Sequence, residues 1–346
     1  MRIPAFFVTG MQGRGYMAAV GSAAVLAFSS ILIRYISDAF ALPVLALAFW
    51  RNAFVCVVLL PLLLVLRTPL LGGLRAHWRF FLCYGSMLAV FNVAWTVSVV
   101  HNGASVATVM NYCSIAYIAV FARLLLGERC TMLKSAASLL CFCGCVLVAG
   151  MTDMEAWRLN GMGVLAGVLS GLLYAAYSLM GRCAAQRGVN PWATLLYTFG
   201  CAACVLWGLN AGFALFAPET GLASADLMPQ RLWGGGGMAT ALPLGWIALL
   251  ALAVGPTLLG YGLYNVSLCH LPSSVANLVL TLEPVLTALV AYRFLGERLS
   301  VVQWAGGVCI MGGVLVLRLA VRSDAEGEAG SARACAVRHR VRGESG

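Results

Sequence analysis

The sequence predicts an all-α integral membrane protein with ten transmembrane helices, arranged as a five-plus-five inverted repeat. Composition, an internal duplication and the placement of positive charge lead to this prediction. Of the 346 residues, 62% are hydrophobic and 10% are charged, and the mean hydropathy is +0.91. Because a soluble domain carries roughly a quarter charged residues, this composition indicates a membrane protein.

The duplication is visible between residues 106–129 and 275–298, which align without gaps at an offset of 169 positions (296 − 127 = 169). Both copies close with the same triplet, Gly127-Glu128-Arg129 and Gly296-Glu297-Arg298. The same offset also matches residues outside the two copies, among them His101 with His270 and Gly144 with Gly313. A register kept through two apolar segments and the turn between them predicts a duplicated unit.

Ten apolar segments of membrane-spanning length follow one another along the chain. They lie near residues 15–36, 44–66, 79–100, 104–126, 131–150, 161–182, 191–216, 242–268, 273–294 and 300–320. Short breaks with proline, glycine or charged residues separate them, which divides the chain into a first five-helix repeat at 15–150 and a second at 161–320. The long break at 217–241 is expected to be a flexible loop, and residues 323–346 a disordered cytoplasmic tail because they are too polar to pack.

Positive charge sets the predicted orientation. With the N-terminus in the cytoplasm, 15 Lys and Arg residues fall inside and 4 outside, so both termini are expected on the cytoplasmic side of the inner membrane. Five spans is an odd number, and the second repeat therefore enters the bilayer inverted, a pattern typical of secondary transporters. The basic residues lie at segment ends and form no stripe with interleaved aromatics, which argues for a lipid partner and against nucleic acid.

Glu283 is the acidic residue placed deep inside a predicted span, where a charge costs about 2.5–3.5 kcal/mol. The adjacent Pro284 has no N–H, so the helix should kink and leave the carbonyl of Leu280 without its helical donor. Two interpretations remain open for Glu283: a structural ion pair with Arg34 or Arg51, or direct participation in transport.

Polar and aromatic side chains from several spans are candidates for lining a cavity around Glu283, since ligand sites are mostly apolar with a few placed polar groups. Asn277 and Thr281 share one helix face, as do Thr108 and Asn111. The further candidates are Trp50, Arg51, Asn92, Trp95, Tyr174, Tyr177, Tyr261, Tyr264 and Asn265. Taken singly, each aromatic is more often a packing residue than a ligand contact. Gly255-Pro256 predicts a weakened helix in the eighth span.

Neither a metal nor a cofactor is expected. Cys201 and Cys204 share a helix face but supply two of the four ligands that zinc requires. The four histidines lie in breaks or in the tail, so the spans lack the nucleophile–base pair that an intramembrane enzyme needs. The chain is therefore not expected to be an enzyme.

The repeat, the Glu283-Pro284 pair, the Leu-Gly-Glu-Arg sequence that closes the fourth and ninth spans, and Arg51 resemble the EamA family of the drug/metabolite transporter superfamily. The resemblance covers roughly residues 15–320. It implies ten helices around a central cavity and movement of metabolites such as amino acids across a cytoplasmic membrane. Ser114-Ile115 stands where the first copy often has Glu-Pro, so a symmetric two-carboxylate mechanism is not implied.

Together these observations favour a secondary transporter that exports amino acids or related small metabolites by alternating access. Proton coupling through Glu283 is a hypothesis within the same interpretation, and a homodimer is one allowed state. An uptake carrier for a nucleotide-derived or vitamin-like metabolite is the alternative within transport. A non-transporting receptor or scaffold that docks partners through its tail is the alternative outside it.

Overall fold

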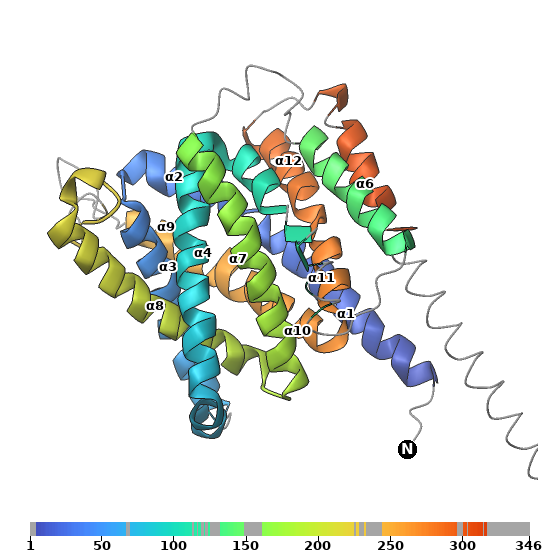
Figure 1. The fold of residues 1–346 in the computed structure, drawn as a ribbon, viewed down its shortest axis with the longest axis horizontal. Coiled ribbons are helices and arrows are strands. Elements are labelled where there is room, and N and C mark those ends of the chain that lie inside the picture. The colour runs from blue at the N-terminus through green and yellow to red at the C-terminus, as the bar shows by residue number, and fades with distance from the viewer. Residues whose placement is uncertain are drawn as a thin grey trace, which may run out of the picture.

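Helices form every regular element of the described residues in a computed structural model of the chain (Figure 1). The structure describes residues 5–66, 70–112, 114–115, 117–118, 121, 124, 132–148, 161–224, 226–227, 232, 244–295, 300–302, 304–313 and 315–316. The two Gly-Glu-Arg triplets and the tail at 323–346 lie outside these residues.

The helices of the first half are α1 (Ala5–Leu26), α2 (Ser29–Phe40), α3 (Val44–Val65), α4 (Leu70–Tyr112) and α6 (Met132–Val148). Those of the second half are α7 (Gly161–Gln186), α8 (Pro191–Phe216), η2 (Pro218–Thr220), α9 (Leu244–Leu252), η4 (Ala253–Gly260), α10 (Tyr261–His270), α11 (Ser273–Leu280) and α12 (Leu282–Leu295). A further apolar helix runs over 304–313. The sequence explains several boundaries: the side chain of Asn190 caps α8, and Pro191 occupies its first turn.

Six helical stretches in the described residues are long and apolar enough to cross a membrane: 13–40, 44–65, 77–101, 161–186, 191–216 and 244–270. They coincide with six of the ten predicted spans. Shorter apolar helices at 135–144, 273–287 and 304–313 match three more. The remaining predicted span, 104–126, is described only in part, at 104–112, 114–115, 117–118, 121 and 124.

Helix α4 is assigned as one helix of 43 residues across the break predicted at 101–103. The chain nevertheless reverses there. A Cβ built on Gly167 of α7 would lie 2.7 Å from both Ser98 Oγ and Met110 Cβ. In a straight helix those two residues would be about 18 Å apart along the axis. They can meet one point on α7 only if α4 folds back between them, as the predicted break requires.

Both predicted weak points in the second half are interruptions of the α-helix. The stretch around Pro256 is the π-helix η4, flanked by α9 and α10. The ninth span divides at Thr281 into α11 and α12, three residues before Pro284. Each proline removes one backbone donor, and the helix reorganises around the gap.

Helix α6 packs against the helix over 304–313 in a reciprocal way (Figure 1). A Cβ on Gly144 would lie 2.7 Å from Ile310 Cγ1, and one on Gly313 would lie 2.4 Å from Cys141 Sγ. The same two glycines also approach the backbone oxygens of Gly306 and Ala137, respectively. Gly144, Cys141 and Ala137 differ from Gly313, Ile310 and Gly306 by 169 positions each, the offset of the sequence repeat. As α6 advances its partner positions decrease, so the two helices run antiparallel.

The loop predicted to be flexible, 217–241, makes specific contacts in its described part. Leu222 O accepts from Leu45 N at 3.0 Å, and Ser224 O accepts from Asn210 Nδ2 at 2.8 Å. Leu227 O accepts from Trp50 Nε1 at 2.6 Å. These bonds tie the loop to α3 and α8.

Candidate functional site

A small cavity of about 30 Å³ lies at the centre of the bundle. Helices α1, α2, α3, α4, α7, α10 and α12 contribute to its wall. The lining residues are Leu26, Ser29, Arg51, Phe91, Trp95, Asn111, Tyr112, Tyr174, Tyr261 and Glu283. Six of them, Arg51, Trp95, Asn111, Tyr174, Tyr261 and Glu283, come from the candidate set predicted from sequence. The cavity has room for water but none for a metabolite, so in this state the site is closed.

Arg51 is one of two charged residues in the cavity wall and is 2% exposed. Its Nη2 donates a hydrogen bond to Asn92 Oδ1, and Asn92 Nδ2 donates in turn to Asn52 Oδ1 at 3.4 Å. Arg51 Nε has no hydrogen-bond partner among the described residues. The guanidinium is therefore positioned by amides and retains an unused donor, as a site for an anionic group requires.

Glu283 is the other charged residue in the wall and lies in the first turn of α12. Its Oε2 lies 2.9 Å from the hydroxyl of Tyr112, at the end of α4. The same hydroxyl lies 2.8 Å from Leu280 O, the carbonyl that Pro284 deprives of its helical donor. The carbonyl predicted to be left free thus has a donor from the first half of the chain.

Arg51 and Glu283 line one cavity without pairing with each other, since no ion pair between these two described residues is present. The side chain of Arg34, the other partner considered for Glu283, lies outside the described residues. In this state the carboxyl group of Glu283 is therefore not held by an ion pair with Arg51. Two ionisable groups, the buried guanidinium of Arg51 and the half-buried carboxyl group of Glu283, instead face the same small volume.

A second polar cluster, adjoining the cavity through stacked tyrosines, contains Asn277 and Tyr264. Tyr264 Oη donates to Ser178 Oγ at 2.6 Å, and Asn277 Nδ2 approaches Ser178 Oγ at 2.5 Å and Tyr264 Oη at 2.8 Å. The rings of Tyr174, Tyr177 and Tyr264 stack with centroids 6.2–6.4 Å apart. This cluster joins α7, α10 and α11 in a buried layer below the cavity wall.

The remaining candidates occupy other positions. Trp50 binds the loop at Leu227 and packs edge-on against Trp246, with ring centroids 4.9 Å apart. Asn265 Nδ2 donates to Pro191 O at 3.4 Å, and Thr281 Oγ1 donates to Leu278 O within its own turn. The side chain of Thr108 lies outside the described residues.

Four lining residues, Leu26, Ser29, Phe91 and Tyr112, were absent from the candidate set. For Tyr112 the sequence contains a usable signal, because the repeat offset aligns it with Thr281 (112 + 169 = 281), next to the Glu283-Pro284 break. The other three carry no pattern that separates them from ordinary core residues.

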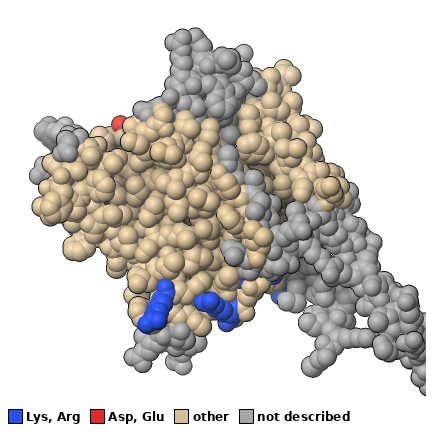
Figure 2. Space-filling view, viewed as in Figure 1, with Lys and Arg blue, Asp and Glu red and all other residues tan. Residues whose placement is uncertain are grey.

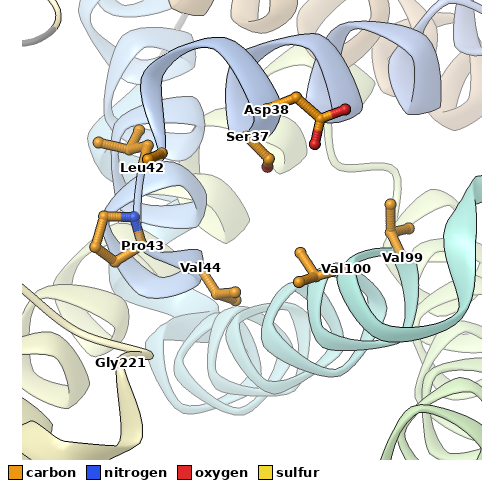
Figure 3. Close-up of a pocket in the computed structure, with 9 residues that line it drawn as sticks. Ser37, Asp38, Leu42, Pro43, Val44, Val99, Val100 and Gly221 are labelled. Atoms are coloured by element: carbon orange, nitrogen blue, oxygen red, sulfur yellow. The ribbon is translucent and has the colours of Figure 1, made fainter. Parts of the chain in front are cut away.

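A larger pocket of about 410 Å³ lies between α2, α3 and α4 at the periphery of the bundle. Figure 3 shows Ser37 and Asp38 of α2 across from Val99 and Val100 of α4, with Leu42 to Val44 and Gly221 completing the wall. It opens next to the anchored loop.

Charge on the visible face is unevenly placed. In Figure 2 the basic side chains gather at one edge of the bundle, and the visible acidic side chain lies at the opposite edge. Within the residues that the structure describes, no group of three or more His, Cys, Asp or Glu side chains is arranged to hold a metal.

A bundle with six helices long and apolar enough to cross a membrane among the described residues defines a multi-pass membrane protein. The chain belongs to the EamA-like transporter family, whose profile matches twice, over residues 13–150 and 161–319. The family membership inferred from the motifs is confirmed, and the two matches bear out the duplication.

Relatives agree with this assignment. An uncharacterized transporter of Archaeoglobus fulgidus is 24% identical over 233 residues, covering 66% of this chain and 74% of that protein. The uncharacterized transporter YwfM of Bacillus subtilis is 28% identical over 197 residues, which is 56% of this chain and 57% of the relative. A solved crystal structure shares the fold with a TM-score of 0.68 at 18% identity, covering 88% of this chain and 96% of that one.

Proposed function

We propose that the protein is a secondary transporter of small metabolites that carry both a carboxylate and an ammonium group, with export of amino acids as its main activity. One observation carries this proposal: the buried Arg51 and the half-buried Glu283 face the same cavity and do not pair. A substrate carboxylate would take the unused Nε donor of Arg51, and its ammonium group would lie against Glu283. An apolar aromatic wall completes such a site.

Transport requires the cavity to open, because its present volume of about 30 Å³ excludes an amino acid. Alternating access between two inverted halves supplies this movement. The inverted arrangement is supported by the antiparallel contact between α6 and the helix over 304–313. In this contact each position on one helix meets the repeat equivalent of its neighbour on the other helix, which is typical of a two-fold axis. An inner-membrane location with cytoplasmic termini is supported by the charge asymmetry in the sequence.

Proton coupling through Glu283 belongs to the same proposal. A half-buried carboxyl group inside a span, in contact with a neutral hydroxyl, can be protonated in one state of the transport cycle and ionised in another. A homodimer stays a prediction.

The test is counterflow of radiolabelled amino acids in proteoliposomes. We expect Arg51→Gln to lower transport about 10- to 100-fold, the effect of losing a charged hydrogen bond worth about 1.5–3 kcal/mol. The exposed Arg79, changed to Gln, is the matched control and should transport normally. Arg51→Lys keeps the positive charge, so it shows whether a loss of transport in Arg51→Gln comes from lost substrate binding or from lost folding.

Equal transport by Arg51→Gln and the unmodified protein would refute the binding role of Arg51. A pH gradient that drives Glu283→Gln as well as it drives the unmodified protein would remove Glu283 from coupling.

A further inference from the structure

The hydroxyl of Tyr112 joins the two halves of the chain at the cavity. It extends from the end of α4 and reaches Leu280 O at 2.8 Å and Glu283 Oε2 at 2.9 Å, on either side of the break between α11 and α12. Tyr112 is 3% exposed and Leu280 is 1% exposed, so bulk water does not reach this group.

A tyrosine hydroxyl has one proton to donate and lone pairs with which to accept. Two oxygens lie within hydrogen-bond distance of Tyr112, and Leu280 O can only accept. Both contacts can be full hydrogen bonds at the same time when Tyr112 donates to Leu280 O and a protonated Glu283 donates to Tyr112 Oη. The closed geometry therefore fits the neutral form of Glu283.

An ionised Glu283 changes this arrangement. A carboxylate is the stronger acceptor, so the Tyr112 proton turns towards it. Leu280 O then loses its donor, and Pro284 has no N–H to replace it. A buried carbonyl without a partner disfavours the closed state, whereas water entering an opened cavity would satisfy it.

We propose that Tyr112 is a positioning residue that links protonation of Glu283 to closure of the cavity. This role rests on the proposed function, in which Glu283 carries the coupling proton. On opening, Glu283 releases its proton to water in the cavity and becomes a carboxylate. The O–H bond of Tyr112 stays intact and only rotates from Leu280 to Glu283.

Other groups face Glu283 across the cavity. Arg51 comes from α3, Tyr174 from α7 and Tyr261 from α10, while α1 and α2 contribute the uncharged Leu26 and Ser29. Arg51 is the one cation among the lining residues that the structure describes, and its charge favours the ionised form of Glu283. The contact with Tyr112 and Leu280 favours the neutral form in the closed state.

Infrared difference spectroscopy on the full chain in lipid tests the proposal without a known substrate. Spectra recorded at acidic and alkaline pH should contain a protonated carboxyl band that Glu283→Gln removes. Tyr112→Phe should shift that band, because the carboxyl group loses its hydroxyl acceptor. Tyr35→Phe, which removes an exposed hydroxyl on α2, should leave it unchanged. A band identical in Tyr112→Phe and the unmodified protein, or none assignable to Glu283, would overturn the proposal.

A second readout uses transport. Tyr112→Phe should lose most of the stimulation by a pH gradient, measured as the ratio of counterflow of radiolabelled amino acids with the gradient to counterflow without it. Stimulation equal to that of the unmodified protein would also overturn the role of Tyr112. Absence of transport for every amino acid tested would count against the proposed function, while the infrared band would still decide the role of Tyr112.

Discussion

Arg51 and Glu283 illustrate at the residue scale how a membrane protein retains ionisable groups inside its spans. Each group is held by a neutral polar partner, Asn92 for the guanidinium and Tyr112 for the carboxyl group. Hydrogen bonds offset part of the cost of removing charge from water. Because neither group is matched with an opposite charge, both remain available to a ligand that enters the cavity.

Asn92→Ala should reveal this cost. The substitution removes the acceptor of a buried guanidinium, and we expect a loss of about 1–3 kcal/mol in the free energy of unfolding. Replacing Arg51 by Met in the same chain should restore part of that loss, since no buried charge then lacks a partner. Thermal unfolding in detergent measures both, and a double variant no more stable than Asn92→Ala would contradict the explanation.

Sequence patterns predict that Arg51 and Glu283 belong to the site, but they predict only some of the residues that contact these two side chains. Glu283 stands out as an acid inside a span, and Pro284 predicts the freed carbonyl. Trp50 was expected beside Arg51, yet neighbouring residues on a helix point about 100° apart. With Arg51 facing the cavity, Trp50 faces Trp246 and the loop. The repeat offset places Tyr112 opposite Thr281, but that its hydroxyl donates to Leu280 O emerges only from tertiary packing.

At the element scale, glycines determine how closely helices approach. A Cβ on Gly85 of α4 would lie 2.3 Å from Cys201 Cβ and 2.8 Å from Thr198 O, both on α8. Since one of these contacts is backbone, a side-chain rotation cannot relieve the clash. The sequence predicts helices of the right length here, but not which glycine lies at a crossing.

Gly85→Ala should therefore destabilise the protein by about 1–3 kcal/mol, the usual cost of overpacking. Gly212→Ala is the matched control, because nothing lies within 4 Å of its Cβ position on α8 and alanine is the better helix former. In thermal unfolding, the Tm of Gly85→Ala should be lower than that of the unmodified protein, and the Tm of Gly212→Ala should be higher. A Gly85→Ala variant as stable as Gly212→Ala would show that α4 and α8 are packed less closely.

Trp50→Phe should loosen the anchored loop. Phenylalanine keeps an aromatic ring against Trp246 but lacks the indole N–H that binds Leu227 O. We expect faster cleavage within 217–241 in limited proteolysis, with the exposed Trp207→Phe on α8 as the control. Unchanged cleavage would mean that the bonds to Asn210 and Leu45 hold the loop without Trp50.

At the scale of the whole molecule, the two halves meet at positions related by the repeat. Cys141 and Ile310, 169 positions apart, are in contact, with Cys141 Sγ lying 3.6 Å from Ile310 O. Tyr112 and Glu283 join the same halves at the cavity. A movement of one half against the other would change both of these contacts, along with the packing of α3 and α4 against α7 and α8. The sequence predicts that the halves are equivalent, but the residues that touch across the junction emerge only from the fold.

The inverted relationship proposed for the two halves makes a prediction about the two Gly-Glu-Arg triplets. If each half has five spans, Glu128 closes the fourth span on the cytoplasmic side, and Glu297 closes the ninth on the opposite side. Reporter fusions after these residues, one active only in the cytoplasm and one only outside it, should give opposite results at the two positions. A fusion after Arg187, in the break between the sixth and seventh spans, serves as a cytoplasmic control. Identical behaviour at Glu128 and Glu297 would mean that the halves enter the membrane in the same sense. The antiparallel contact between α6 and the helix over 304–313 would then need another explanation, and alternating access between inverted halves could not be how the cavity opens.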